Sequence, residues 1–381
     1  MSLFVEFHLI QNFAPSNLNR DDTGAPKDAV FGGHRRARVS SQCFKRAMRL
    51  DAADNATVSP EFQGVRTKKL KFLLENRLRE LGRDDAGGRI DEALAGAGLK
   101  VKEDGKTEYL LFLGRGEIEA LAQLIHTHWD VLGVTPPASD GKKSKKEAKA
   151  AVPPEVVKEA KGLLNGKKAV DIALFGRMLT DIPEVNQNAA CQVAHAISTH
   201  KVDREFDYFT AVDDCAQPGE PKVEMIDNVE FNSATFYRYA VLDVAKLERN
   251  LHGDRDLALK GLAAFAQAMA RAIPSGKQNT FAAHNPPSFV GVVLRHSSPF
   301  NLANAFEVPV WPRADQALTA LSVAKLAEHD TAISAFYGDG QDSWAYLDMT
   351  NAWPKDKGEA RPNLVALTEW VVDRVRVELE G

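Results

Sequence analysis

KDAVFGGHRRARVSSQCFKRAMRL, residues 27–50, is the stretch that decides how this chain begins to fold. Its basic first half leads to two serines, Ser40 and Ser41, which are candidate N-caps for a helix over residues 42–50. At about 3.6 residues per turn, one side of that helix consists of Gln42, Lys45, Arg46 and Arg49, and the other of Cys43, Phe44, Ala47 and Met48. We therefore expect one face to pack against the core and the other to be cationic.

Strand and helix patterns on either side of this helix indicate a sheet core. Residues 2–10 are rich in Phe, Val and Ile, and residues 233–243 and 288–296 have the same character, so all three are predicted strands. Apolar residues at helical spacing lie between the last two. The order strand, helix, strand suits a ferredoxin-like or RNA-recognition fold, which makes this an α+β protein.

Two insertions interrupt this predicted core. Residues 66–82, 108–133 and 153–165 have helical patterns, so the block from about residue 56 to residue 168 is predicted to be a mostly helical insertion. Residues 201–232, with the turn formers Gln-Pro-Gly-Glu near their middle, are predicted to form a long β-hairpin.

Composition places the chain among ordinary packed proteins. Of its 381 residues, 44% are hydrophobic and 26% are charged. It has no apolar run of about 18 residues and no basic, cleavable leader pattern, so we expect a cytoplasmic protein without a membrane partner. The three cysteines, Cys43, Cys191 and Cys215, form no CxxC pair, and neither a disulfide framework nor a zinc site is expected.

The charge is unevenly distributed along the chain. The overall net charge is −4, but residues 1–200 carry 30 basic against 26 acidic side chains, and residues 201–381 carry 18 against 26. The two parts therefore have net charges of +4 and −8. Such a molecule can hold a polyanion on one face and present acidic surface elsewhere, including to another copy of itself.

The basic stretch has the residue types that a nucleic-acid backbone requires. Phosphates repeat along a strand, so a binder needs several cations on a rigid element, with polar side chains for sugar and phosphate oxygens. The candidates are Lys27, the run His34–Arg38, Lys45, Arg46 and Arg49 for charge, and Asn19, Arg20, Ser40, Ser41 and Gln42 for hydrogen bonds. The alternative is a solvated helix face preceded by a basic loop.

Three further groups allow a structural and a functional interpretation. Phe206, Tyr208 and Phe209 in the predicted hairpin are core residues or stacking platforms for bases. Met178 fills a gap or wedges between bases. The lysine run Lys142, Lys143, Lys145, Lys146 and Lys149 is a solvated segment or a patch for nucleic-acid backbone.

The sequence offers little for catalysis. His126 and His128 lack an acidic partner in a metal-binding motif, and the pair Asp213–Asp214 has no further ligands nearby. No phosphate-binding loop or nucleophile elbow is present. We therefore expect no catalytic residue, no metal and no cofactor, and hence no enzyme.

Several long runs resemble one family. They are NRDDTGAPKDAVFGGHRRARVSSQCFKRAMR (19–49), VDIALFGRM (170–178), VAHAISTHKVDREFDYFTAVDD (193–214), SATFYRY (233–239), GKQNTFAAHNP (276–286) and NLANAFE (301–307). Together they resemble the backbone subunit of the type I-E CRISPR surveillance complex, Cascade (the CasC family). Residues 52–168 and 311–381 are similar mainly in length and texture.

The resemblance implies a shape like a right hand and a role in antiviral defence. The implied RNA-recognition-type palm comprises residues 1–55, 169–200 and 233–381, the helical fingers residues 56–168 and the thumb hairpin residues 201–232. Copies of such a subunit polymerise along one CRISPR RNA, together with other Cascade subunits. They hold the guide by its backbone and leave its bases free to pair with target DNA.

The resemblance also implies roles for individual residues. The guide RNA would contact Asn19, Arg20, Lys27, Ser40, Gln42, Lys45, Arg46 and Arg49. Arg177 and Met178 would lie against bases near the thumb, and Tyr208 and Phe209 would be the stacking pair of the thumb. Lys142, Lys143, Lys145 and Lys146 would contact target DNA, whereas Lys277 and Gln278 match the family without an assigned role.

Two other classes of function stay open at this point. One is a metal-independent ribonuclease that processes CRISPR transcripts with a histidine such as His34 as general base. The other is an architectural protein that binds duplex DNA.

Overall fold

The structure is a computed structural model that describes residues 3–133, 152–165, 168–212, 214–215, 223–338 and 342–380. The chain divides into two compact units. The first, which we call the sheet unit, consists of Met1–Asn55, Gln192–Val244 and Leu262–Gly381. The second, the helical unit, consists of Ala56–Cys191 and Ala245–Gly261.

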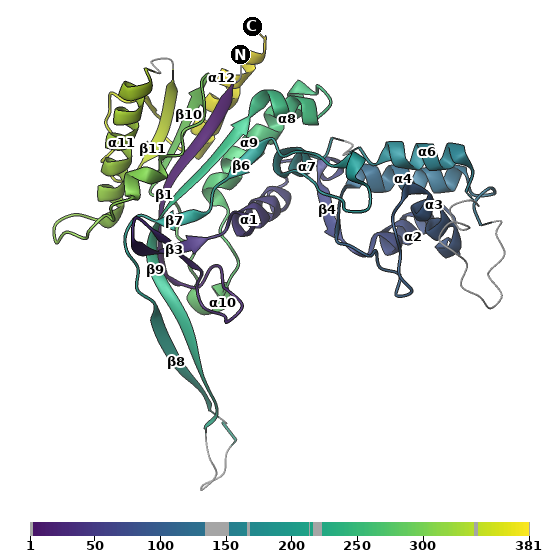
Figure 1. Cartoon of the computed structure of the whole chain (residues 1–381), viewed down its shortest axis with the longest axis horizontal. Helices are drawn as coiled ribbons and strands as arrows, with labels where there is room; N and C mark the ends of the chain where they lie inside the picture. Colours follow the sequence, from purple (N-terminus) through teal and green to yellow (C-terminus); the bar gives the residue numbers. More distant parts are fainter. Residues whose placement is uncertain are drawn as a thin grey trace. The chain divides into compact units, whose positions relative to one another are not determined.

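Four antiparallel strands form the centre of the sheet unit (Figure 1). They lie in the order β10 (Phe289–Arg295), β1 (Phe4–Ser16), β9 (Val223–Asp243) and β7 (Ala196–Ser198). In chain order these are the fourth, first, third and second strands. That is the arrangement of the ferredoxin-like fold, whose two crossover helices are here α1 (Ser41–Asp54) and α9 (Arg255–Arg271). The predicted α+β fold is confirmed.

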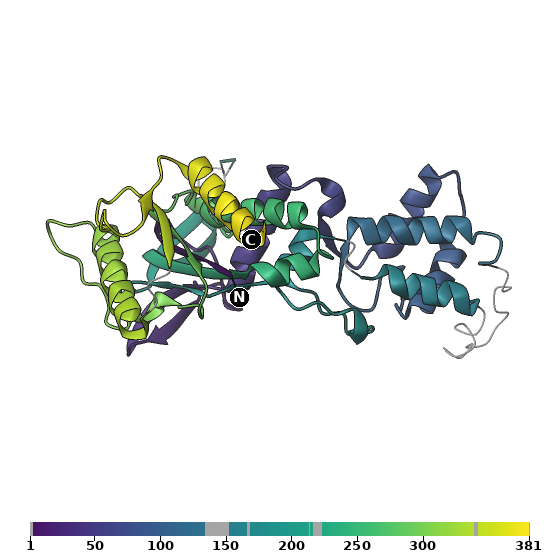
Figure 2. The same ribbon diagram turned by 90° about the horizontal axis from the view of Figure 1, so that it is seen from above.

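Helices cover both faces of this sheet, because successive side chains of a strand point to opposite faces. On one face, Phe7 of β1 packs edge-on against Phe265 of α9 with ring centroids 5.3 Å apart. On the other, Ile10 and Tyr237 join a core with Phe306 of η3 (Leu302–Phe306) and Leu326 of α11 (Leu318–Tyr337). Figure 2 shows α11 (yellow-green) and α12 (Leu364–Glu380, yellow) beside the sheet.

The basic run before α1 is a hairpin rather than a loop. Strands β2 (Asp28–Phe31) and β3 (His34–Val39) pair through Gly32 and Gly33, which both have positive φ. A Cβ added to Gly32 would lie 1.8 Å from the carbonyl oxygen of Glu307, so only glycine fits there. The side chain of Arg36 is fully buried and donates hydrogen bonds to the carbonyl oxygens of Ser198 and Phe306. This arginine is therefore part of the core and is absent from the surface.

Strand β9 continues beyond the sheet into a second hairpin. Its first half pairs with β8 (Glu205–Val212), with Glu205 opposite Phe231 and Tyr208 opposite Asn228. Figure 1 shows this hairpin projecting away from the sheet. The pairing agrees with the hairpin predicted for this part of the chain.

The helical unit has a hydrophobic core of its own. Its buried residues include Leu74, Ile90, Leu121 and Val156. They come from α2 (Leu70–Glu80), α3 (Gly87–Ala97), α4 (Arg115–Thr127) and α6 (Pro154–Leu163). A two-stranded sheet of β4 (Gly64–Thr67) and β5 (Leu111–Gly114) replaces helix in parts of two segments that we predicted to be helical. The prediction was wrong for those parts.

Shorter elements complete both units: η1 (Pro60–Phe62), α7 (Val170–Phe175), η2 (Pro183–Val185), β6 (Cys191–Val193), α8 (Val244–Asn250), α10 (Gln278–Phe281), β11 (Ser343–Asp348) and β12 (Glu359–Ala360). Within the described ranges, no helix combines the length and hydrophobicity needed to cross a membrane. The division into palm, fingers and thumb stays a prediction.

Candidate nucleic-acid interface

Helix α1 has the two faces that its sequence predicts. Ser40 is the N-cap, and its Oγ accepts a hydrogen bond from the backbone N–H of Cys43 at 3.3 Å. The buried side is formed by Phe44, Ala47 and Met48, with Cys43 half-buried, and the outer side has Gln42 and Arg46 exposed and Lys45 and Arg49 half-exposed. Because the buried side fixes the helix on the sheet, the polar side chains are held on a rigid element.

Asn19 and Lys27 lie at the N-terminus of this helix. The backbone N–H of Ser40 donates to Asn19 Oδ1 at 2.9 Å, and the N–H of Lys27 donates to the Asn19 carbonyl oxygen at 2.9 Å. Arg20 follows directly, is exposed, and forms a β-bridge with Pro26. Burial raises the pKa of the Cys43 thiol, and the positive charges of Lys27 and Arg46 partly oppose that rise. Both cations therefore lie close to Cys43.

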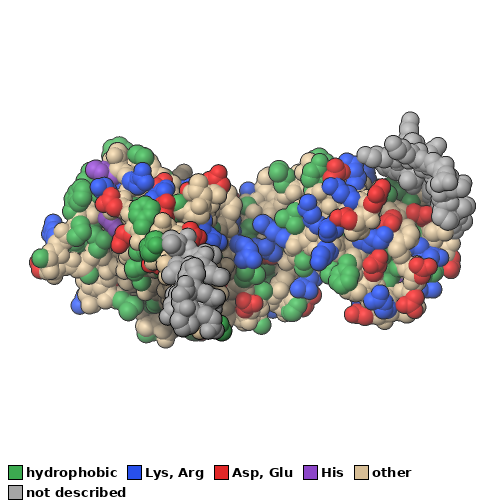
Figure 3. All heavy atoms as spheres, turned by 90° about the horizontal axis from the view of Figure 1, so that it is seen from below, with side chains coloured by type: hydrophobic (Ala, Val, Ile, Leu, Met, Phe, Trp, Pro, Cys, Tyr) green, Lys and Arg blue, Asp and Glu red, His purple; other side chains and the backbone are tan. Residues whose placement is uncertain are grey.

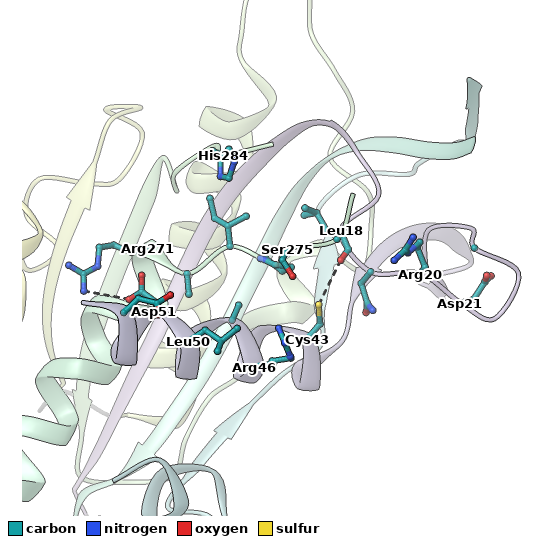
Figure 4. Close-up of a pocket in the computed structure, with 18 of the residues that line it drawn as sticks. Leu18, Arg20, Asp21, Cys43, Arg46, Leu50, Asp51, Arg271, Ser275 and His284 are labelled. Atoms are coloured by element: carbon teal, nitrogen blue, oxygen red, sulfur yellow. Dashed lines mark hydrogen bonds and ion pairs between the residues drawn. The ribbon is translucent and has the colours of Figure 1, made fainter. Parts of the chain in front are cut away.

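A groove runs along α1 (Figure 4). It has a volume of about 810 Å³, and Arg20 and Arg46 line it together with Ser275 and His284. Toward the C-terminus of α1 the lining becomes acidic, with Asp54 and with Asp51, which pairs with Arg271 at 3.5 Å. Burial raises the pKa of Asp51, and the charge of Arg271 partly opposes this. Asp21 and Asp22 line the groove beside Arg20, so carboxylates lie at both ends and the groove as a whole is not a cationic channel.

Arg38, part of the predicted basic run, contacts His195, which was not among the predicted site residues. Arg38 donates from Nε to the carbonyl oxygen of Asp28 at 3.1 Å, and its Nη1 lies 2.9 Å from Nδ1 of His195. Burial, followed by the positive charges of Arg38 and Lys27, lowers the pKa of His195. The sequence signals were the basic run that contains Arg38 and the family-like run that contains His195.

The projecting hairpin is aromatic and acidic. Phe206 and Tyr208 are 67% and 62% exposed, and they share one face because they are two positions apart on β8. Phe209 is half-buried and points to the opposite face, so Tyr208 and Phe209 do not form one stacking surface. Among the hairpin side chains that the structure describes, the carboxylates are Glu205, Asp207, Asp227 and Glu230, the last of which pairs with Arg204. Carboxylates repel phosphates, so bases, and not the nucleic-acid backbone, suit this hairpin.

The open sheet face that RNA-recognition folds use is closed in this protein. In such folds, aromatic side chains on the strands stack directly on bases. Here the corresponding aromatics, Tyr237 and Tyr239 on β9 and His8 on β1, are all buried under η3 and α11. The sheet unit therefore has to contact RNA with surfaces other than this sheet face, and α1, the loop before it and the hairpin are among them.

In the helical unit, the structure gives Arg177 a place different from the one expected. Its Nη1 lies 2.8 Å from both carboxylate oxygens of Glu117, and its Nη2 donates to the carbonyl oxygens of Leu164 and Val185. Because the side chain is 1% exposed, it cannot lie against bases from this position. Met178, in contrast, is 81% exposed.

The structure describes His34 but not the four lysines predicted to contact DNA. Lys142, Lys143, Lys145 and Lys146 lie outside the described residues. The ring of His34 lies edge-on to Trp311 with centroids 6.0 Å apart. The described part of the chain contains no group of three or more His, Cys, Asp or Glu side chains that could hold a metal ion.

One face of the surface shows where charge is concentrated. In Figure 3, Lys and Arg side chains gather in groups, whereas Asp and Glu side chains are interspersed among them over the helical unit on the right. Charge alone therefore does not mark the interface, and the hydrogen-bonded frame around α1 is the more specific feature.

These features define an α+β protein with a ferredoxin-like sheet, an inserted helical unit, a cationic helix face and a projecting aromatic hairpin. The chain belongs to the family described as CT1975-like protein, whose model matches residues 5–370.

Two solved structures are similar over nearly the whole chain. One, described as "CRISPR RNA-guided surveillance complex, pre-nicking", has a TM-score of 0.85 and 30% sequence identity over 97% of this chain and 99% of that chain. The other, described as "CRISPR RNA-guided surveillance complex", has a TM-score of 0.73 and 25% identity over the same shares of the two chains. A comparison with curated proteins gives no match.

Proposed function

We propose that this chain is the CRISPR RNA-binding backbone subunit of a type I-E Cascade surveillance complex and that it has no catalytic role. Several copies assemble along one guide RNA together with other Cascade subunits, and target DNA reaches them by pairing with the guide. The similarity to chains of CRISPR RNA-guided surveillance complexes along almost the full length supports this proposal.

The observation that carries the proposal is the polar face of α1. Gln42, Lys45 and Arg46 project from a helix whose other face is buried, and the link from Ser40 to Asn19 fixes the loop that bears Arg20 and Lys27. Rigid cations at the spacing of a helix suit the repeating phosphates of a strand and carry no sequence information. Binding by the backbone leaves the bases free to read the target.

The exposure and burial of the described side chains support some of the proposed contacts, and the family resemblance alone supports those of the fingers lysines, which lie outside the described residues. The guide backbone lies against Asn19, Arg20, Lys27, Gln42, Lys45, Arg46 and Arg49, and Ser40 supports this surface as the cap of α1. The hairpin presents Phe206 and Tyr208 to bases, whereas Phe209 supports the hairpin from its other face. Met178 is an exposed apolar contact for a base, and Lys142, Lys143, Lys145 and Lys146 contact target DNA.

The experiment that tests this function uses the purified full chain. It is mixed with RNA that contains a CRISPR repeat and spacer, with duplex DNA of the same sequence as competitor, and the bound fraction and RNA length are measured. We expect retention of intact RNA at moderate salt with little competition by the duplex. Failure to retain RNA, or preference for the duplex, would refute the proposal.

The same incubation tests the ribonuclease alternative. A specific cut within the repeat that is lost in His34→Ala would identify an enzyme in place of a structural subunit. Because the ring of His34 lies edge-on to Trp311, and no hydrogen bond or ion pair joins it to a carboxylate among the described residues, we expect no cut.

A further inference from the structure

The hydrogen bond between Arg38 and His195 fixes the protonation of an exposed imidazole. The Nη1 of Arg38 lies 2.9 Å from Nδ1 of His195. A guanidinium has donors and no acceptor, so Nδ1 must be the acceptor and carry no proton. The ring is therefore neutral, and its proton is on Nε2, the nitrogen that Arg38 does not bind. His195 thus offers a single uncharged N–H donor.

The position of this donor is fixed from both sides. The N–H of Ala194 donates to the carbonyl oxygen of Tyr239 at 2.9 Å, and Ala196 pairs with Val39 in the sheet. Arg38 itself is held by the carbonyl oxygen of Asp28. His195 is nevertheless exposed. A side chain that is rigidly oriented and open to solvent is suited to bind a ligand, because little rotamer freedom is lost on binding.

The charges nearby explain what kind of ligand atom suits His195. Lys27 and Arg38 are both close enough for their charges to act on the imidazole, and with burial, which has the largest effect, they lower its pKa. The ring thus stays neutral at neutral pH. Phosphate oxygens are best matched by the cations Lys27 and Arg46, whereas an uncharged N–H suits an uncharged oxygen. In a nucleic-acid backbone, the 2′-hydroxyl of ribose is such an oxygen, and DNA lacks it.

We propose that Nε2–H of His195 donates a hydrogen bond to a ribose 2′-hydroxyl of the strand whose phosphates lie at Lys27, and that this contact selects RNA over DNA. Arg38 is the positioning residue, because it holds the ring and its tautomer without touching the ribose. This inference rests on the proposed function, since it places the guide backbone beside α1, and it adds a determinant of sugar specificity.

The test compares two single-stranded oligonucleotides of one sequence, as RNA and as DNA, bound to the full chain. Dissociation constants are measured for the wild type, His195→Ala and His195→Gln, with circular dichroism to verify folding. In His195→Ala we expect RNA affinity to fall about three- to tenfold, which is the effect of one lost hydrogen bond, and DNA affinity to stay unchanged. His195→Gln keeps an amide donor and should retain part of the preference. Lys45→Ala serves as a matched control that weakens both oligonucleotides equally.

Two outcomes would overturn this inference while leaving the proposed function in place. One is an equal loss for RNA and DNA in His195→Ala, and the other is no change for either. A change in self-association without any change in RNA affinity would assign His195 to a protein interface and also overturn it. If the wild-type chain bound no RNA at all, the proposed function itself would fail.

Discussion

Arg177 and Glu117 form a buried ion pair across 60 positions of the chain, with Nη1 at 2.8 Å from both carboxylate oxygens and side chains that are 1% and 0% exposed. Removing one partner of such a pair leaves an uncompensated buried charge. Arg177→Ala should therefore destabilise the protein by about 3–5 kcal/mol. Thermal and urea unfolding measure this effect. If Arg177→Ala had the stability of the wild type but a lower affinity for RNA, Arg177 would instead belong to the RNA interface.

The hairpin makes a prediction about which aromatic residues contact bases. Phe206 and Tyr208 share an exposed face, and Phe209 lies half-buried on the other. Because base stacking contributes about 1–3 kcal/mol per aromatic residue, Phe206→Ala and Tyr208→Ala should each weaken RNA binding by that amount. Phe209→Ala should weaken it less. Fluorescence titration with labelled RNA measures these affinities. A larger loss of affinity for Phe209→Ala than for Phe206→Ala would contradict the prediction.

Arg35 and Arg36 are adjacent and should behave very differently. Arg36 is fully buried and binds three carbonyl oxygens, those of Ser198, Phe306 and Glu307. Arg36→Ala should lower the free energy of unfolding by at least about 2 kcal/mol, because hydrogen bonds from charged donors contribute about 1.5–3 kcal/mol each. Arg35 is 53% exposed and pairs with Asp28, so Arg35→Ala, the matched control, should cost no more than about 1 kcal/mol. Equal losses of unfolding free energy for the two variants, measured by urea unfolding, would contradict a core role for Arg36.

A buried ionic network predicts how stability depends on pH. Burial raises the pKa of Glu6, but hydrogen bonds and charges from His8 and Arg295 lower it by more, so the folded-state value lies below the ordinary 4.5. The ionised carboxylate thus stabilises the fold above pH 4.5, and this contribution is lost as the pH falls below it.

Glu6→Gln removes that titration. Its stability should decline less between pH 7 and pH 3 than the wild type's, although it starts lower, since a buried charge pair has been broken. Urea unfolding over this pH range measures the difference. The exposed residue Glu328 on α11 provides the control, because Glu328→Gln should follow the wild-type curve. Parallel curves for wild type and Glu6→Gln would show that Glu6 does not govern acid stability.

The sequence was informative where burial imposes a regular pattern. Strands β1 and β10 were predictable because they are short runs rich in Val, Leu and Phe, and the division of α1 because its apolar residues recur at helical spacing. The hairpin of β2 and β3 was missed because β2 is only four residues long and β3 carries basic side chains, of which Arg36 is buried through contacts with residues far along the chain. Helix α3 was missed because its buried face depends on small residues such as Ala93 and Ala97 among glycines.

In the candidate site, too, local features were predictable from the sequence and contacts between distant residues were not. The exposed face of α1 follows from local spacing, since a helix brings residues three and four positions apart together. The place of Arg177 depends on Glu117, and the tautomer of His195 depends on Arg38, 157 positions earlier. No local pattern in the sequence encodes such pairs, so they become visible only in the folded chain.

The most direct test of the central claim is the salt dependence of RNA binding by the double variant Lys45→Ala/Arg46→Ala. Dissociation constants are measured against salt concentration for several unrelated guide sequences, with Lys355→Ala, an exposed lysine distant in sequence from α1, as control. If α1 grips phosphates, affinity falls equally for every sequence, and the slope of log K against log salt decreases by about 0.7 for each lost contact. An unchanged slope, or a loss confined to one sequence, would contradict the account.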